Sequence, residues 1–128
     1  LDYEGLYGQG YRMIITGEMG IGNTTPSSAM ASVRLSREPA EVTGRGAGLS
    51  TAGLEHKIEI IRQAIAVNKP DKDDILDVLS KVGSLDIAGM LGCYLGGAIV
   101  GVPVLIDGFI SSVAAYCAVT APPSLPER

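Results

Sequence analysis

The amino-acid sequence predicts an α/β protein built on a parallel sheet. Two short apolar stretches, "YRMIIT" (11–16) and "VPVLI" (102–106), each precede a polar loop and a helical pattern, and further helical patterns lie between them. Strands that alternate with helices in this way are typical of parallel sheets. Ligands of such folds bind at the carboxyl ends of the strands. We therefore expect a site at the loops "GEMGIGN" (17–23) and "DGF" (107–109).

The length and charge of the chain restrict the classes of protein to consider. Its 128 residues suffice for one domain with one modest core. The net charge of −4 argues against a broad basic surface for nucleic acid. Cys93 and Cys117 lie among apolar residues, and nothing resembles a signal peptide. We therefore expect a cytoplasmic protein whose two thiols fill the core.

The first strand is expected within residues 11–16, and a helix follows it. This helix is predicted to begin around Thr25, with Pro26 in its first turn, where a missing N–H group costs nothing. The next segment, residues 37–50, is polar and punctuated by glycines, which indicates a connection without regular structure.

Two amphipathic helices are expected in the middle of the chain. The first carries apolar residues at spacings of four, three and four, namely Leu54, Ile58, Ile61 and Ile65. The segment "NKPDKDD" (68–74) ends it, and the second helix follows with Ile75, Val78, Leu79 and Val82. The acidic residues at 71–74 suit the amino end of this second helix, so we interpret them as a helix cap and not as a cation site.

Residues 87–106 carry no charged side chain, so a membrane span has to be considered. Glycines interrupt the segment, Pro103 follows, and no Lys or Arg cluster flanks either end. We therefore predict no membrane contact, and instead a buried helix over 84–100 and a buried strand over 102–106. Three small residues would form a stripe for close packing of this helix, namely Gly89, Cys93 and Gly96.

The chain ends in a predicted apolar helix over 109–119 and a proline-rich tail that is expected to be unfolded. The resulting division is an N-terminal stretch of residues 1–13, an α/β core of residues 14–118 and a tail of residues 119–128.

The loop "GEMGIGNTT" (17–25) has the features of a phosphate-binding loop. Gly20 and Gly22 allow backbone N–H groups to approach an anion, and the helix that follows adds its N-terminal dipole and hydroxyl groups. The pattern is neither a Walker loop nor a dinucleotide fingerprint, and a tight structural turn is the alternative. Glu18 favours the functional interpretation, because a carboxylate beside a phosphate is expected to handle a cation or a proton.

Two basic residues outside this loop are further candidates. Arg45 lies between two glycines, and Lys57 is predicted to face out of its helix opposite Ile58 and Ile61. The alternatives are a surface turn for Arg45 and a solvated helix face for Lys57. His56, the single histidine, is expected on the same solvated face, and no cluster has metal-ligand spacing.

Five motifs in order make the sequence similar to the nicotinate-nucleotide–dimethylbenzimidazole phosphoribosyltransferase family. They lie between Ile14 and Ala118 and are "GEMGIGNTT", "VTGRGAGL", the Lys-Ile pair at 57–58, "DVLSKVGSLDIAGMLG" and "VPVLIDGFISS". The resemblance implies a Rossmann-like parallel sheet with helices on both sides, and a dimer. It also implies transfer of phosphoribosyl from nicotinate mononucleotide to 5,6-dimethylbenzimidazole in cobalamin biosynthesis, giving α-ribazole phosphate and nicotinate. No cofactor is expected.

The resemblance also implies which residues form the site. Glu18 would be catalytic, favouring the positive charge that develops on the sugar or orienting a ribose hydroxyl. Lys57 would offset the charge of the phosphate. The substrate-binding residues implied by the matching motifs are Gly20, Gly22, Asn23, Thr24, Gly44, Arg45, Gly46, Lys57, Asp107, Gly108 and Phe109.

The departures from the family pattern make the predicted sheet incomplete relative to the family. Its members are much longer, their benzimidazole pocket uses an N-terminal region without a counterpart here, and their general-base glutamate lies in a motif beyond residue 128. Two interpretations stay open. The chain is a phosphoribosyltransferase fragment or truncated copy, or it is a non-catalytic nucleotide-binding or interaction module. In either case the helix over 84–100 is expected to expose an apolar patch and to promote self-association.

Overall fold

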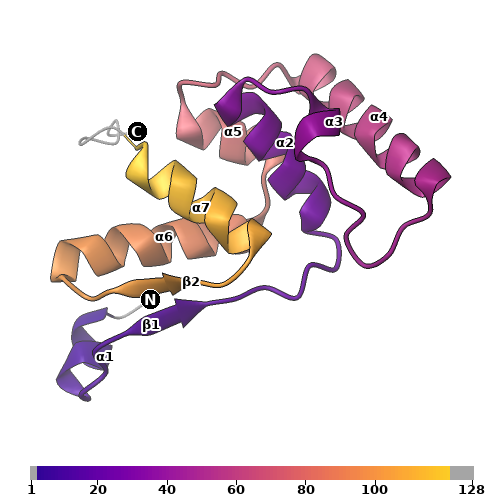
Figure 1. Ribbon diagram of the computed structural model, residues 1–128. Helices are drawn as coiled ribbons and strands as arrows, with labels where there is room; N and C mark the ends of the chain where they lie inside the picture. Colours follow the sequence, from indigo (N-terminus) through magenta and orange to yellow (C-terminus); the bar gives the residue numbers. More distant parts are fainter. Residues whose placement is uncertain (1–2, 122–128) are drawn as a thin grey trace.

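The computed structural model describes residues 3–121, so residues 122–128 of the predicted tail lie outside the described part. Two strands form a parallel sheet, β1 (Ile14–Thr16) and β2 (Val104–Ile106). Ile14 pairs with Val104, Ile15 with Leu105 and Thr16 with Ile106. The α/β class with a parallel sheet is therefore confirmed, and both predicted strands are present (Figure 1).

The helices predicted from apolar spacing are also present. The bounds of the helices are α1 (Tyr3–Gly8), α2 (Thr24–Leu35), α3 (Pro39–Val42), α4 (Thr51–Asn68), α5 (Ile75–Val82), α6 (Leu85–Val100) and α7 (Phe109–Val119). The short α3 lies in a segment predicted to be irregular. It forms because Pro39 occupies its first turn and the Glu41 side chain accepts a hydrogen bond from the backbone N–H of Glu38, at 3.1 Å.

One face of the sheet is covered by helices and the other is not. Figure 1 shows α6 and α7 on the same side of the two strands. Ile15 and Leu105 are paired and so point to the same face, where 66% and 51% of their surfaces are exposed. The prediction of a buried strand is therefore wrong for Leu105 and Ile106, which are 51% and 47% exposed.

Helix α2 lies at the centre of the helical part of the molecule. It contacts α3, α4, α5 and α7, and most of its turns are buried (Figure 1). Its buried serines do not lack partners, because each hydroxyl donates to a backbone carbonyl: Ser27 to Asn23 at 2.8 Å, Ser28 to Val42 at 3.2 Å and Ser32 to Arg37 at 2.6 Å. Small residues thus let neighbouring helices approach α2 closely without leaving polar groups unsatisfied.

Helix α6 begins at a serine cap and ends at a glycine. The Ile87 N–H group donates to the Ser84 hydroxyl at 3.3 Å, and Gly101 adopts the left-handed conformation with φ of 70°. The predicted small-residue stripe is wrong at Gly89, which is exposed and where an added Cβ would meet nothing within 4 Å. Among the described residues, no helix is both long and apolar enough to cross a membrane.

Helix α6 was expected to expose an apolar patch, and it exposes large apolar side chains near its two ends. On α6 itself Leu85 and Ile99 are 91% and 84% exposed. The other large exposed side chains near the strands are Met13, Ile15, Met19, Ile21, Leu105 and Ile106. Exposed apolar side chains are therefore also found along the sheet and in the loop after β1.

The predictions for the two cysteines and for the cap of α5 are confirmed in part. Cys117 is fully buried in the core, and burial raises the pKa of its thiol against the opposing effect of the nearby Arg34. Cys93 is only half-buried, so the core-filling prediction is confirmed for Cys117 alone. The helix cap is confirmed at Asp74, whose carboxylate accepts from the N–H groups of Leu76 at 2.9 Å and Asp77 at 3.0 Å.

Two glycines of the α5–α6 region are expected to respond oppositely to alanine. A Cβ at Gly83 would lie 2.5 Å from the Leu79 carbonyl oxygen, so Gly83→Ala should lower the free energy of unfolding by about 1–3 kcal/mol. Gly92 lies inside α6 with open space around it, so Gly92→Ala should raise that free energy by about 0.5–1 kcal/mol. Urea denaturation followed by circular dichroism measures both, and equal stabilities would contradict the geometry.

Candidate functional site

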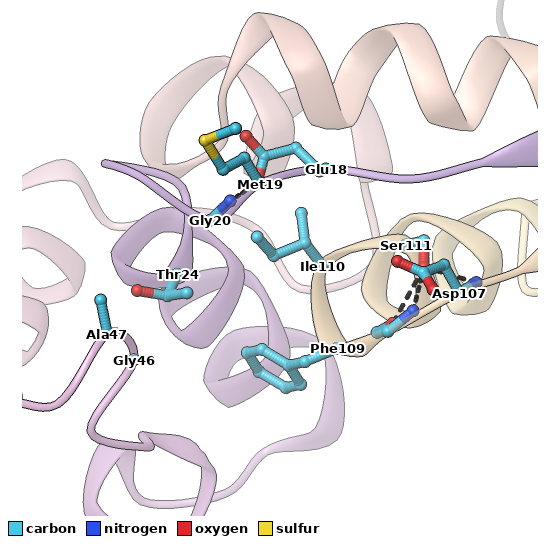
Figure 2. A pocket seen from close by; sticks show the side chains of 11 residues that line it. Glu18, Met19, Gly20, Thr24, Gly46, Ala47, Asp107, Phe109, Ile110 and Ser111 are labelled. Atoms are coloured by element: carbon cyan, nitrogen blue, oxygen red, sulfur yellow. Dashed lines mark hydrogen bonds between the residues drawn. The ribbon is translucent and has the colours of Figure 1, made fainter.

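The candidate site is a cavity of about 300 Å³ at the carboxyl ends of both strands. Glu18 follows β1 and Asp107 follows β2, and because the strands are parallel and paired, both residues reach the same end of the sheet. Figure 2 shows these two side chains on the cavity wall with Thr24 and Gly46 on its other side. The two loops that the sequence singled out at the strand ends therefore line one cavity.

The glycine loop holds Glu18 in a fixed position. Gly20 and Gly22 have φ values of 92° and 79°, a backbone conformation that residues other than glycine rarely adopt. This path lets the Gly20 N–H group donate to Oε2 of Glu18 (Figure 2), while Oε1 accepts from Nδ2 of Asn23 at 2.9 Å. Both carboxylate oxygens of Glu18 are thus bonded within the loop.

Asn23 is buried and joins two carboxylates. Besides Glu18, its Nδ2 atom donates to Oδ2 of Asp86 at 2.6 Å. Asp86 belongs to the first turn of α6 and was not among the predicted site residues. The sequence signal that could have identified it is the "SLDIAG" segment, which places an acidic residue just after a helix cap.

Lys57 is buried, which contradicts the prediction that it faces out of its helix. Only 9% of its surface is exposed, and its Nζ donates to Oγ1 of Thr24 at 2.9 Å and to the Gly44 carbonyl oxygen at 3.3 Å. The physical reason is the helical period, since Lys57 and the fully buried Ile61 are four residues apart and therefore share a face of α4. His56, by contrast, is exposed as predicted.

The ammonium group of Lys57 has no anionic partner among the described residues, because none of their ion pairs includes it. Burial lowers its pKa from the ordinary value of 10.5. Gly46, with φ of 57°, keeps the space beside it open, since a Cβ there would lie 3.2 Å from Oγ1 of Thr24 and 3.7 Å from Nζ of Lys57. The site thus contains a buried cation with room for an anion nearby.

The motif after β2 is held by a serine. The Ser111 hydroxyl oxygen accepts from the N–H groups of Asp107 at 3.1 Å and Gly108 at 2.8 Å, and it donates to the Gly108 carbonyl oxygen at 2.9 Å (Figure 2). These bonds start α7 and place Phe109 at the cavity edge, where it is 46% exposed. Sequence reasoning missed Ser111, although a serine three residues after Gly108 is a capping position.

Only part of the predicted site reaches the cavity. The predicted residues that line it are Glu18, Gly20, Thr24, Gly46, Asp107, Gly108 and Phe109. Those that do not are Gly22, Asn23, Gly44, Arg45 and Lys57, of which Asn23, Gly44 and Lys57 contact lining residues or their neighbours. The Arg45 side chain instead donates to the Leu49 carbonyl oxygen at 2.8 Å and to Oγ1 of Thr51 at 3.2 Å, so it folds back onto its own loop.

The cavity therefore has two chemically different ends. Thr24, which accepts a bond from the Lys57 ammonium, lies on one side and the Asp107 carboxylate on the other, with Glu18 on the wall between them (Figure 2). Such an arrangement suits an elongated ligand with an anionic group at one end and hydroxyl groups or positive charge at the other. Four further residues complete the wall and were not predicted, namely Met19, Ala47, Ile110 and Ser111.

Comparison with known sequences gives a consistent result. Residues 3–127 match the sequence model of a family described as Phosphoribosyltransferase. Proteins called nicotinate-nucleotide–dimethylbenzimidazole phosphoribosyltransferase from Ruminiclostridium cellulolyticum and Roseiflexus castenholzii are 53% and 55% identical over 115 residues, which is 90% of this chain. Each match covers 33% of the relative, so the chain spans about a third of the length of the curated relatives it matches.

The fold has a similar solved counterpart. The crystal structure of CobT from Thermus thermophilus superimposes with a TM-score of 0.82 and 32% sequence identity. The superposition covers 91% of this chain and 35% of that protein. The arrangement of helices and strands is therefore one that also occurs within a longer protein.

The lowered pKa of Lys57 predicts a pH-dependent stability. Because folding lowers the pKa of Lys57, the buried charge reduces the free energy of unfolding at any pH at which the lysine is protonated in both the folded and the unfolded protein. This reduction becomes smaller as the pH rises through the folded-state pKa toward 10.5, the ordinary value that applies to the unfolded protein. The free energy of unfolding of the wild type, relative to a Lys57→Met variant, should therefore increase between neutral and alkaline pH. Urea titrations at several pH values measure this difference, and a pH-independent difference would contradict the burial argument.

Proposed function

Since the chain belongs to the phosphoribosyltransferase family, we propose that it forms the nucleotide half of a nicotinate-nucleotide–dimethylbenzimidazole phosphoribosyltransferase site. The reaction of the whole enzyme would move phosphoribosyl from nicotinate mononucleotide to 5,6-dimethylbenzimidazole, giving α-ribazole phosphate and nicotinate in cobalamin biosynthesis. The relatives that share about half of their matched residues with this chain carry that name.

The observation that carries the proposal is the unneutralised ammonium of Lys57. A buried charge without a counter-ion is costly, and a phosphate next to Thr24 and Gly46 would supply the missing negative charge. The phosphate of nicotinate mononucleotide has the required charge, and its ribose would extend toward the carboxylate end of the cavity. Lys57, Thr24 and the Gly46 backbone are therefore the proposed phosphate contacts.

Glu18 is the proposed catalytic group of this half-site. Transfer at the anomeric carbon develops positive charge on the ribose, and a carboxylate fixed in advance stabilises such charge without reorganisation. Glu18 is fixed by its bonds to Gly20 and Asn23. Asp107 is exposed at the same end, where it would accept a hydrogen bond from a ribose hydroxyl.

A second candidate function is a non-catalytic nucleotide-binding or interaction module. It is favoured by the apolar side chains that the two strands expose, such as Ile15 at 66% and Leu105 at 51%. In this case the nucleotide site would be retained, and the exposed apolar side chains of β1 and β2 would bind another copy or a partner protein. For both candidates we propose a cytoplasmic protein without a nucleic-acid or membrane partner.

Replacement of Lys57 tests the nucleotide site. If the ammonium contacts the phosphate, Lys57→Ala should weaken binding of nicotinate mononucleotide by about 1–3 kcal/mol, which is typical of a charge-assisted hydrogen bond. Isothermal titration calorimetry measures the affinity. The matched control is Lys81→Ala, because Lys81 pairs with Asp77 on the surface of α5. Unchanged affinity in a folded Lys57→Ala protein would remove Lys57 from the site.

Residues 1–128 alone are expected not to catalyse the reaction. General-base assistance contributes roughly 10²- to 10⁴-fold to a rate, and the glutamate implied by the family resemblance is not among these residues. Glu18 is already bonded at both oxygens, so it is a poor replacement. An assay for α-ribazole phosphate on the purified chain tests this. Turnover that disappears in Glu18→Gln would show instead that Glu18 serves as the base.

The same sample is expected to self-associate. Ile15, Leu105 and Ile106 expose much of their surface on and around the sheet, and burial of these side chains against a second copy would remove apolar surface from water. Light scattering measures the size of the species in solution. A soluble monomer at all concentrations would contradict the expectation.

A further inference from the structure

We propose that Asp86 is a positioning residue, which holds the Glu18 carboxylate in place through the side chain of Asn23. The proposal rests on the proposed function, because it assigns Glu18 a role toward the ribose. Asp86 belongs to α6 and does not line the candidate cavity of about 300 Å³, although Asp86 and Glu18 both line a second cavity of about 690 Å³ beside β1. The route to Glu18 that hydrogen bonds support runs through Asn23.

The first support is the use of the Asn23 amide. A carboxamide nitrogen carries two hydrogens, and here one is donated to Glu18 at 2.9 Å and the other to Asp86 at 2.6 Å. Both acceptors are carboxylates, which form stronger hydrogen bonds than neutral oxygens do. Asn23 itself is only 7% exposed, whereas Glu18 is half-buried and Asp86 exposed, so the donor side of both bonds is shielded from water. The orientation of the amide is therefore set from both sides.

The second support is that the Asn23 side chain does not cap α2. It occupies the N-cap position of α2, where an asparagine side chain ordinarily accepts a hydrogen bond from the first turn. Here its backbone is in the right-handed helical region and its side chain makes no capping bond. The stabilisation that a cap would give α2 is thus forgone, and the side chain instead links the loop after β1 to the amino end of α6.

The third support is the anchored backbone of Asp86. It lies in the first turn of α6, where the helix dipole favours a negative charge. The next residue, Ile87, is fully buried in the core, and the Ser84 cap fixes the start of the helix. The backbone at Asp86 is therefore anchored, while its exposed side chain is held by the bond from Asn23. Without this side chain, one hydrogen of the Asn23 amide would lose its partner, and the bond from Asn23 to Glu18 would be less well oriented.

A double-mutant cycle tests whether Asp86 acts through Glu18. The probe is nicotinate mononucleotide, and calorimetry measures its affinity for residues 1–128. Asp86→Ala should weaken binding about tenfold, the size expected for the loss of one oriented bond to a charged group. In a Glu18→Ala background the same substitution should have almost no further effect. Equal effects in both backgrounds would overturn the proposal.

Two control variants separate positioning from helix stability. Asp86→Asn retains an oxygen that can accept from Asn23, so its affinity should stay within about threefold of the wild type. Ser84→Ala removes the cap of the same helix without touching Asn23 and should leave the affinity unchanged. If Ser84→Ala weakens binding as much as Asp86→Ala, Asp86 acts only by stabilising α6, and the proposal fails.

A second measurement does not depend on any ligand. Proton–nitrogen NMR spectra report the Asn23 side-chain amide and the Gly20 backbone amide, and the latter donates to the other oxygen of Glu18. Asp86→Ala should shift both signals, whereas Ser84→Ala should not. If the Gly20 signal does not move, the position of Glu18 is independent of Asp86 and the proposal is overturned. If both signals move while the wild type binds no nucleotide, the positioning stands and the proposed function fails.

Discussion

The burial of the Lys57 ammonium is the constraint on which the arrangement of the site depends. A charged group that leaves water has to be given hydrogen-bond partners, and Lys57 finds them in Thr24, 33 residues away in the chain, and in the Gly44 carbonyl. These bonds join the start of α2, the loop before α4 and α4 itself. The position of Gly46 follows from them, and with it the shape of one wall of the cavity. A substitution at Lys57 therefore affects both the charge and the assembly of this wall.

Much of the fold could be predicted from the sequence, because apolar spacing and parallel-strand geometry are local or general rules. The α7 bounds of 109–119 and the meeting of Glu18 with Asp107 at one end of the sheet follow from such rules. The burial of Lys57 was not predicted, because Lys57 was assigned to the wrong face of α4; it shares a face with the buried Ile61. The bond between Asn23 and Asp86 joins residues 63 positions apart. The "SLDIAG" segment indicates only that Asp86 follows a helix cap, not that it contacts Asn23.

The exposure of β2 shows a different limit of sequence reasoning. An uncharged segment indicates that its side chains favour burial. Burial also requires a neighbouring element that packs against these side chains. Val102 has such neighbours and is 7% exposed, whereas Leu105 on the uncovered face is 51% exposed. The apolarity of a strand therefore does not by itself decide whether its side chains are buried.

The pairing of β1 with β2 has a consequence for the order of folding. It joins distant parts of the chain, as in the bond from Thr16 to the Leu105 carbonyl, 89 residues apart, whereas α2 contacts α3 and α4 nearby in sequence. Closing a long loop costs entropy before its contacts form, so the helices around α2 are expected to form first and the strand pair last. Pulse-labelling hydrogen exchange would detect this as earlier protection of α2 than of Ile15. The phosphate end of the cavity would then exist before its carboxylate end, which the strand pair completes.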